Sequence, residues 1–306
     1  MTVPWNPEFS LAPEQAHALI VEQFPQLAPA ALELLGSGWD NTAFCVNGEF
    51  VFRFPRRQAG ADCLATEVRI LPALQSLLPL SIPNPTFVGR PADRFPRLFA
   101  GYPLLAGRTA CAAALDARQR EAAAEPLAEF LAVLHSLDPA CVRKLDAPPD
   151  RLGRLDLARR IPQMHERLEE CVRLSLIGDP APCRAIIDAS AAQPDRPKAL
   201  VHGDLYVRHI LIGSDMRPSG IIDWGDVHAG DVALDLSIAH TFLPSTAHDA
   251  FRRAYGPIDD ATWRLARFRA LSYGLILSIY ADRTNDADLR REARFIIANI
   301  TGEDSW

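Results

Sequence analysis

The chain has 306 residues, of which 48% are hydrophobic and 23% charged, and its formal net charge is −6. A mildly acidic chain lacks the basic surface that general nucleic-acid binding requires, so we expect no nucleic-acid partner. Of its 32 lysines and arginines, only Lys144 and Lys198 are lysine. No lysine precedes Lys144, so we expect an arginine wherever a side-chain cation neutralises a phosphate in that part of the chain.

The six cysteines form no C-x-x-C pair. Because the chain is long and rich in core residues, we expect reduced and mostly buried thiols rather than a disulfide framework. The first residues do not follow the pattern of a signal peptide. The longest apolar run, residues 270–281, is shorter than the ~20 residues of a membrane span. We expect a cytoplasmic monomer without a membrane partner.

The sequence pattern of the first third of the chain predicts a sheet accompanied by helices. Residues 13–24 are predicted to form a helix that Ser10 caps. Residues 42–46 and 49–54 flank Asn47-Gly48, which predicts a hairpin with a two-residue turn. Apolar spacing predicts a helix over residues 61–78, and two further strands are predicted near residues 86–89 and 97–105.

Beyond Gly107 the pattern is mainly helical. Helices are predicted over residues 116–137, 155–176 and 183–192, and again from residue 232 to the end, with a short β-rich island at residues 200–224. This order predicts an α+β, two-lobed fold. We expect a nucleotide-binding lobe over residues 1–105, and a larger, mostly helical catalytic and substrate-binding lobe with an inserted hairpin over residues 106–306.

Polar residues that could carry chemistry lie at the ends of two short apolar strands. The segment LVHGDLYVRHILI, residues 200–212, contains Asp204 and, five residues later, His209. The segment IIDW then places Asp223 directly after a second apolar strand. Because rigid strands hold such groups in fixed positions, we expect the three side chains to form a reaction centre.

These two segments resemble the catalytic loop and the metal-binding segment of the aminoglycoside phosphotransferase family, which includes macrolide kinases and has a protein-kinase-like fold. The resemblance implies that Asp204 orients the attacking hydroxyl and accepts its proton. It also implies that Asp223 holds Mg²⁺ at the phosphates of ATP or GTP. Such sites work mainly by positioning groups and neutralising charge.

The same resemblance assigns residues in the first lobe to nucleotide binding. Gly36, Ser37 and Gly38 match the loop that covers the phosphates. In the strand FVFRF the phenylalanines alternate with Val51 and Arg53, so Arg53 faces away from them. Arg53 takes the place of the lysine that grips the phosphates, and Glu67 matches the acid that pairs with it.

The family's hinge, whose backbone bonds the nucleotide base, corresponds to the segment with Pro103 and Leu105. The hinge residues favour neither adenine nor guanine, so ATP and GTP both remain open. After Asp223, the resemblance implies that Asp231 starts a helix and that Asp235 is a buried brace for the catalytic loop.

This sequence departs from the family pattern at two positions. Arg53 keeps the charge of the usual lysine but has a larger, forked head group. His209 replaces the usual asparagine, and its nitrogen suits Mg²⁺ less well than an oxygen ligand. His209 is therefore a candidate metal ligand or a residue that only shapes the loop.

The acceptor is predicted less closely than the reaction. An aminoglycoside is a polycation and needs acidic residues, for which Asp226 and Asp282 are candidates. From Asp223 onward there are thirteen acids and nine arginines, a small acidic excess. The apolar residues 271–280 could instead line a macrolide pocket, and another hydroxylated metabolite is also an open alternative.

Two other classes of function compete with a kinase. His202, Asp204, His209 and Asp223 are residue types that bind transition metals, which suggests a metal-dependent hydrolase. A hydrolase leaves the glycine loop, Arg53 and Glu67 without a role. The two departures suggest a third possibility, a nucleotide-binding module without catalytic activity.

Overall fold

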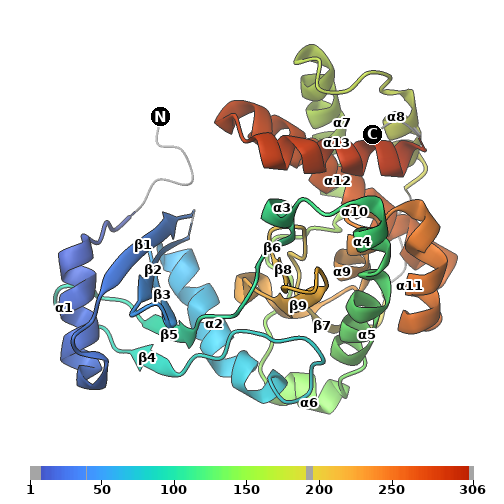
Figure 1. The fold of residues 1–306 in the computed structure, drawn as a ribbon. Coiled ribbons are helices and arrows are strands. Elements are labelled where there is room, and N and C mark those ends of the chain that lie inside the picture. Colours follow the sequence, from blue (N-terminus) through green and yellow to red (C-terminus); the bar gives the residue numbers. More distant parts are fainter. Residues whose placement is uncertain (1–7, 39, 191–195, 303–306) are drawn as a thin grey trace. The chain divides into compact units, whose positions relative to one another are not determined.

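The computed structural model describes residues 8–38, 40–190 and 196–302 (Figure 1). The chain divides into two compact units. Unit 1 contains Met1–Ala106 and Asp223–Asp226, and unit 2 contains Gly107–Ile222 and Val227–Trp306. None of the helices in the described ranges has the length and apolar composition needed to cross a membrane.

Unit 1 is built on a five-stranded antiparallel sheet. The strands are β1 (Leu32–Ser37), β2 (Asn41–Val46), β3 (Phe50–Pro55), β4 (Phe87–Gly89) and β5 (Phe99–Pro103), in the spatial order β1-β2-β3-β5-β4. Two helices accompany the sheet, α1 (Pro13–Gln23) and α2 (Gln58–Leu74), with the short 3₁₀ helices η1 (Pro25–Leu27) and η2 (Trp224–Asp226). In Figure 1, α1 and α2 lie on opposite sides of the sheet.

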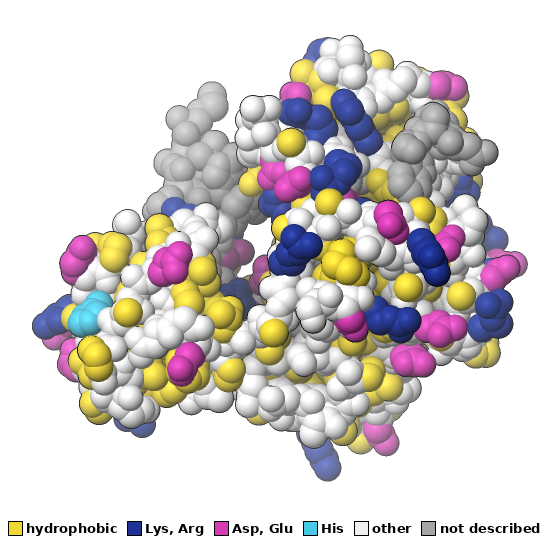
Figure 2. Space-filling model, in the orientation of Figure 1, with side chains coloured by type: hydrophobic (Ala, Val, Ile, Leu, Met, Phe, Trp, Pro, Cys, Tyr) yellow, Lys and Arg dark blue, Asp and Glu magenta, His cyan; other side chains and the backbone are white. Residues whose placement is uncertain are grey.

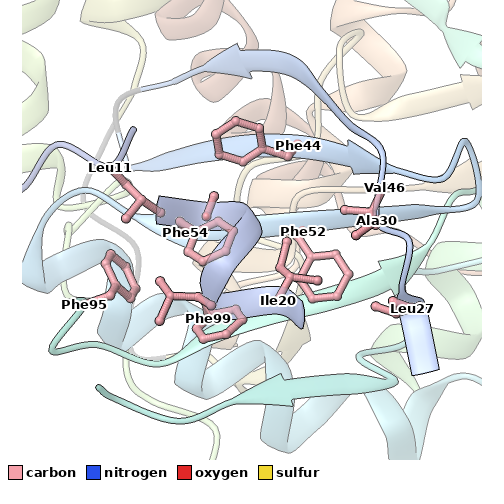
Figure 3. Packing of buried hydrophobic residues seen from close by; sticks show 12 residues of the cluster. Leu11, Ile20, Leu27, Ala30, Phe44, Val46, Phe52, Phe54, Phe95 and Phe99 are labelled. Carbon is pink, nitrogen blue, oxygen red and sulfur yellow. The ribbon is translucent and has the colours of Figure 1, made fainter. Parts of the chain in front are cut away.

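The two-residue period of β3 separates the two faces of this sheet. Phe52 and Phe54 are fully buried in a core with Phe44, Phe99 and Ile20 of α1 (Figure 3). The ring of Phe54 stacks on that of Phe99, with centroids 4.7 Å apart. Because neighbouring side chains in a strand point to opposite faces, this core leaves Arg53 on the face that α2 covers.

The β2–β3 turn is one residue longer than predicted. Asn47 and Gly48 have φ values of 55° and 69°, and the N–H of Glu49 donates to Val46 O at 3.0 Å. The first paired residues are Val46 and Phe50, so Glu49 belongs to the turn. The prediction that Ser10 caps the first helix is wrong, because the N-cap is Ala12, whose N–H bonds the side chain of Gln15 at 2.9 Å.

Unit 2 is mostly helical. Its helices are α3 (Ala110–Ala113), α4 (Ala117–Glu121), α5 (Ala124–His135), α6 (Pro139–Lys144), α7 (Leu157–Arg173), α8 (Ala181–Asp188), α9 (Ala233–Leu236), α10 (Ile238–Thr241), η3 (Ser245–Ala247), α11 (His248–Tyr255), α12 (Asp260–Thr284) and α13 (Ala287–Thr301). Helix α12 packs against α13 and α7, and α11 packs against α5. The predicted helix 116–137 is two helices, α4 and α5, separated by a tight turn in which Ala123 N–H donates to Arg120 O at 3.1 Å.

The long C-terminal helices begin and end at residues suited to those positions. Asp259 and Asp286 are the N-caps of α12 and α13, and each accepts a backbone N–H with its carboxylate. Asn285 and Gly302 end the two helices in the left-handed conformation. Such caps satisfy backbone groups that a helix leaves unpaired at its ends.

Short strands in unit 2 carry the predicted catalytic loop. Strand β7 (Ala199–Val201) pairs with β10 (His228–Gly230), and β8 (Ile210–Ile212) pairs with β9 (Pro218–Ile221) and β6 (Arg108–Thr109). The loop lies between β7 and β8, whose six residues are almost all fully buried. Both ends of the loop are therefore fixed in the interior of unit 2.

The six cysteines, all within the described ranges, form no disulfide bond, and four of them are buried, which confirms the expectation of mostly buried thiols. On the face in Figure 2, positive and negative side chains are interspersed with apolar ones, and no single charge dominates.

Candidate functional site

Arg53 pairs with Glu67 inside unit 1. One guanidinium nitrogen of Arg53 donates to both Glu67 oxygens, at 2.9 and 2.8 Å, and the Tyr102 hydroxyl donates to the same carboxylate at 3.3 Å. Glu67 shares the buried face of α2 with Leu64 and Leu71. Burial outweighs the charge of Arg53 and raises the pKa of Glu67 from its ordinary 4.5 to about 7.

Asp223 is the second carboxylate at Arg53. The other terminal nitrogen of Arg53 donates to Asp223 Oδ1 at 3.1 Å, and the Asp223 side chain is 47% exposed. Burial lowers the pKa of Arg53, but the Glu67 and Asp223 carboxylates raise it further than burial lowers it. Asp223 has a φ of 63°, a left-handed conformation that is uncommon for a residue other than glycine and that clusters at functional sites.

The predicted glycine loop continues from β1 and is tied to the start of α2. Gly36 and Ser37 end β1 at an irregularity in the pairing, and Gly38 N–H bonds Asn41 O at 2.9 Å. Asp40 pairs with Arg57, and a Cβ at Gly60 would lie only 2.7 Å from Asp40 O. The tip residue Trp39 lies outside the described residues.

The predicted hinge follows β5. Pro103 is the last residue of that strand and pairs with Phe50, and it has no N–H to offer a base. The next N–H, on Leu104, already donates to Glu49 O at 2.7 Å. Leu105 lies in the following segment, which has no regular secondary structure. The first part of unit 1 ends one residue later, at Ala106.

Asp235 holds the start of the catalytic loop in unit 2. Its carboxylate accepts the backbone N–H groups of His202 and Gly203, at 2.7 and 2.8 Å, and it also lies 3.1 Å from His135 Nε2. His135 in turn bonds the Tyr255 hydroxyl at 2.9 Å. Burial would raise the pKa of Asp235, but the hydrogen bond from His135 and the loop amides lower it. The predicted brace is confirmed.

Asp204 lies among positively charged groups. Its Oδ1 accepts the Tyr273 hydroxyl at 2.7 Å, and terminal nitrogens of Arg154 and Arg269 lie 3.6 and 3.7 Å from the same oxygen. Burial would raise the pKa of Asp204, but Arg154, His209 and Arg269 hold it below its ordinary value. Asp204 is therefore an ionised carboxylate at neutral pH.

Histidines on both sides of Asp204 shape the loop. His202 is fully buried, and burial lowers its pKa, so its ring is neutral. Its Nδ1 accepts the Asp204 N–H at 3.3 Å and its Nε2 donates to Ile222 O at 3.0 Å. His209 Nδ1 donates to Asp204 O at 2.8 Å, so in the neutral ring Nε2 is the nitrogen with a lone pair.

The two predicted acidic residues for a cationic acceptor belong to different units. Asp282 is exposed on α12, nine residues beyond Tyr273, which is about 13 Å along a helix axis. Asp226 belongs to η2 in unit 1 and is half-buried. The role of these two residues in acceptor binding stays a prediction.

The sequence did not predict which three residues lie next to Asp204, although residues 271–280, which include Tyr273, were a candidate lining for a macrolide pocket. Tyr273 and Arg269 come from α12, four residues apart and hence on one face of the helix, and Arg154 comes from the loop before α7. The only signal in the sequence is an arginine and a tyrosine at this spacing inside an apolar stretch. That signal does not say which loop the helix meets.

The family model for the phosphotransferase enzyme family matches residues 31–271, which covers more than three quarters of the chain and includes Arg53, Glu67, Asp204, His209, Asp223 and Asp235. The chain belongs to the phosphotransferase enzyme family. Its fold is that of the aminoglycoside phosphotransferase kinases, and its reaction class is nucleotide-dependent phosphoryl transfer. No curated protein matches the chain.

Solved structures agree with this membership. The GDP complex of wild-type aminoglycoside 2′-phosphotransferase-IIIa is 25% identical and covers 96% of this chain and 100% of its own, with a TM-score of 0.69. A GDP and kanamycin complex of a related aminoglycoside phosphotransferase is 26% identical over 95% and 99% of the two chains, with a TM-score of 0.67. The macrolide 2′-phosphotransferase of Brachybacterium faecium is 23% identical over 90% and 93%, with a TM-score of 0.55, and shares the fold.

Proposed function

We propose that this chain transfers the terminal phosphate of ATP or GTP to a hydroxyl of a small molecule, with Asp204 as the base. The surroundings of Asp204 carry this proposal. A carboxylate that stays ionised, takes a hydrogen bond from Tyr273 at 2.7 Å and follows a braced loop can orient a hydroxyl without being protonated itself at neutral pH.

The low pKa of Asp204 indicates how it acts. A weak base does not remove the proton of a free alcohol, but it accepts a hydrogen bond from the hydroxyl and so points the oxygen at the phosphorus. As the new O–P bond forms, the bond from the γ-phosphorus to the bridging oxygen breaks and the nucleoside diphosphate leaves, while the hydroxyl becomes acidic and its proton passes to Asp204. In a loose phosphoryl-transfer transition state such late proton transfer is sufficient.

On the nucleotide side, we assign Arg53, held by Glu67, to the phosphates and Asp223 to a magnesium ion. An exposed carboxylate is the hard oxygen ligand that Mg²⁺ prefers, so Asp223 fits the metal, and His209 Nε2 is a weaker candidate. Gly36, Ser37 and Gly38 are assigned to the phosphates, and the backbone around Pro103 and Leu105 to the base. When bound, Mg²⁺ neutralises phosphate charge.

Within the described residues, no three or more histidine, cysteine or acidic side chains gather in a way that would hold a metal by themselves. This is expected where Mg²⁺ is held by one or two carboxylates and the phosphates of a substrate. It disfavours a hydrolase in which His202, Asp204, His209 and Asp223 form a transition-metal cage.

The solved relatives named above act on aminoglycosides and macrolides, and this supports an antibiotic as the acceptor. The predicted acidic residues Asp226 and Asp282 would serve a cationic aminoglycoside. The observation that favours a different acceptor is the pair of arginines beside Asp204.

The test is phosphate transfer from ATP and GTP, measured with an acceptor panel in the presence of Mg²⁺. Asp204→Asn should lower kcat about 10³-fold while nucleotide still binds, because it removes the base only. Asp223→Asn should abolish the Mg²⁺ dependence of nucleotide binding. Wild-type turnover in Asp204→Asn would refute the assignment, and nucleotide binding without transfer to any acceptor would favour a non-catalytic module.

A further inference from the structure

We propose that Arg154, Arg167 and Arg269 form an anion-binding subsite beside Asp204, and that the acceptor carries a carboxylate, phosphate or sulfate group near its reactive hydroxyl. We call these three residues the arginine subsite. The inference rests on the proposed function, because it names the acceptor class of the same site. All three arginines belong to unit 2, as does Asp204.

Arg269 is buried without a full set of partners. The residue is 6% exposed, and its guanidinium lies over the Tyr273 ring, 4.0 Å from the centroid. Its Nη2 lies 3.7 Å from Asp204 Oδ1, which is longer than a hydrogen bond. Its Nε is buried and has no hydrogen-bond partner among the residues that the structure describes. A buried donor without a partner is costly, and a ligand oxygen would remove that cost.

Arg167 shows the same deficit on α7, the helix that packs against α12. Its Nη1 is buried and has no hydrogen-bond partner in the described part of the chain. Burial and then the charge of Arg269 lower the pKa of Arg167. Glu166 and Glu170 oppose this shift, but Glu170 already pairs with Arg283 at 2.6 Å. The repulsion between Arg167 and Arg269 is therefore only partly relieved by the protein.

Arg154 is held by a loop that is itself well ordered by hydrogen bonds. The Asp150 carboxylate accepts the N–H groups of Gly153 and Arg154, both at 2.9 Å, and Arg160 donates to Gly153 O at 2.8 Å. These bonds fix the backbone at Arg154, whose terminal nitrogen lies 3.6 Å from Asp204 Oδ1. A cation on such a support is positioned in advance for a ligand.

The three arginines carry more positive charge than Asp204 can balance. Asp150 near Arg154, and Glu166 and Glu170 near Arg167, offset part of this charge, but the pKa of Arg167 is still lowered. Arg160 belongs to the same neighbourhood, because burial and then Arg159, Arg269, Arg167 and Arg154 lower its pKa. An excess of like charge that is partly buried is stabilised by an anion.

Two simpler explanations account for only part of this arrangement. Arg154 and Arg269 could serve only to keep Asp204 ionised, but this leaves Arg167 without a role, because within the described ranges Arg167 forms no ion pair with Asp204. The arginines could instead meet the phosphate that is being transferred, in which case they would respond to the nucleotide rather than to the acceptor. A polycationic acceptor would meet like charges here, which costs binding energy.

The first experiment measures anion binding without knowledge of the acceptor. Inorganic phosphate should raise the melting temperature of the full chain, relative to chloride at equal ionic strength, by roughly 3 °C or more. Arg167→Gln should lose at least half of this shift. Arg173→Gln, a change on the same helix at a side chain that is 71% exposed, should retain it.

Arg53→Gln separates the subsite from the nucleotide phosphates. The phosphate-dependent shift should persist in this variant, because Arg53 belongs to unit 1. Loss of the shift in Arg53→Gln with full retention in Arg167→Gln would overturn the inference, as would the absence of a shift in the wild type.

The second experiment compares acceptors that share a hydroxyl skeleton but differ in charge. Transfer to a hydroxy acid is compared with transfer to its amide, and transfer to a sugar phosphate is compared with transfer to the free sugar. Kanamycin and gentamicin are the cationic acceptors in the same panel. We expect kcat/KM to be at least 100-fold higher for the anionic member, and the two anionic arms distinguish a carboxylate from a phosphate. In Arg167→Gln, the KM of the anionic acceptor should rise at least tenfold and that of the nucleotide less than twofold.

The failure of this inference and the failure of the proposed function look different. Equal or better transfer to neutral or cationic acceptors overturns the arginine subsite but leaves phosphoryl transfer intact. Absence of both Mg²⁺-dependent nucleotide binding and transfer overturns the proposed function, and the phosphate melting experiment then still decides whether Arg167 and Arg269 bind an anion.

Discussion

In unit 1 one arginine lies between two carboxylates, whereas in unit 2 one carboxylate lies beside two arginines. Arg53 contacts Glu67 and Asp223, and Asp204 has Arg154 and Arg269 as neighbours. The carboxyl groups of Glu67 and Asp204 are both largely buried, but the pKa of Glu67 is raised to about 7 while that of Asp204 is lowered. The difference teaches that the surplus charge, rather than burial alone, decides the state of a buried acid.

The two arrangements suit opposite partners. We expect a single cation that is held by acids to bind phosphate only with moderate strength, and we propose that the exposed carboxylate of Asp223 binds a metal ion. An acid that is surrounded by cations stays ionised and leaves positive charge for an anionic group. The four predictions below test this contrast, beginning with the largest expected effect.

Asp235→Ala should destabilise the chain by about 4 kcal/mol, because two backbone N–H groups and His135 lose a buried acceptor. Urea unfolding measures the loss. The variant should also lower kcat while the KM of the nucleotide stays nearly constant, because the brace acts on the loop that carries Asp204. An unfolding free energy within 1 kcal/mol of the wild type would show that the loop does not depend on Asp235.

Glu67→Gln and Asp204→Asn should change the pH dependence of stability with opposite signs. A carboxyl whose pKa is higher in the folded state than in the unfolded state stabilises the fold at pH values below its unfolded pKa of about 4.5. This contribution is lost as the pH rises through about 7. For Glu67 the loss amounts to about 3 kcal/mol. For Asp204, whose pKa is lowered, the contribution is present above 3.8 and is lost as the pH falls.

Unfolding by urea from pH 3 to pH 8 measures both effects. The stability of the wild type relative to Glu67→Gln should fall as the pH rises, and that relative to Asp204→Asn should fall as the pH drops below about 4. If the stability of the wild type relative to each variant changed with pH in the same direction for Glu67→Gln and Asp204→Asn, the proposed contrast between Glu67 and Asp204 would be contradicted.

Arg53→Ala should raise the KM of the nucleotide about tenfold, because it removes charge-assisted hydrogen bonds and leaves two carboxylates unbalanced. Arg53→Lys should recover part of this loss, since it restores the charge but not the fork that bonds Glu67 and Asp223. Steady-state kinetics with the acceptor at saturation give the values. An equal KM for the alanine and lysine variants would argue against a phosphate role for Arg53.

Arg283→Gln should change the unfolding free energy by less than about 0.5 kcal/mol, because its ion pair with Glu170 is largely exposed. It should also slightly weaken the stabilisation by inorganic phosphate, since Glu170 is then able to neutralise Arg167. A stronger phosphate effect in this variant would contradict the charge balance that we propose for the arginine subsite.

Much of unit 1 was predictable because its signals are local. The alternation in β3 separates Phe52 and Phe54 from Arg53, and the helical spacing of α2 puts Glu67 on the face with Leu64 and Leu71. Two periodicities thus predict one ion pair. The turn at Asn47 was predicted in kind but one residue short, because the backbone pairing beyond the turn decides how many residues it contains.

The single predicted helix 116–137 failed for a related reason. Composition and apolar spacing continue through Ala122 and Ala123, and nothing in that stretch marks a break. Arg120, however, reaches Glu292 of α13 through a buried ion pair at 2.6 Å, a contact between residues far apart in the chain. Local preference does not contain such information.

The sequence by itself determined the family and the order of the elements, and it predicted Asp204, Asp223, Arg53 and Glu67 as site residues, because these depend on short motifs and on periods of two and 3.6 residues. The tertiary structure decided what surrounds Asp204. Tyr273 and Arg269 come from α12, Arg154 from a distant loop and Arg167 from α7, and only the packing of these helices brings their charges together.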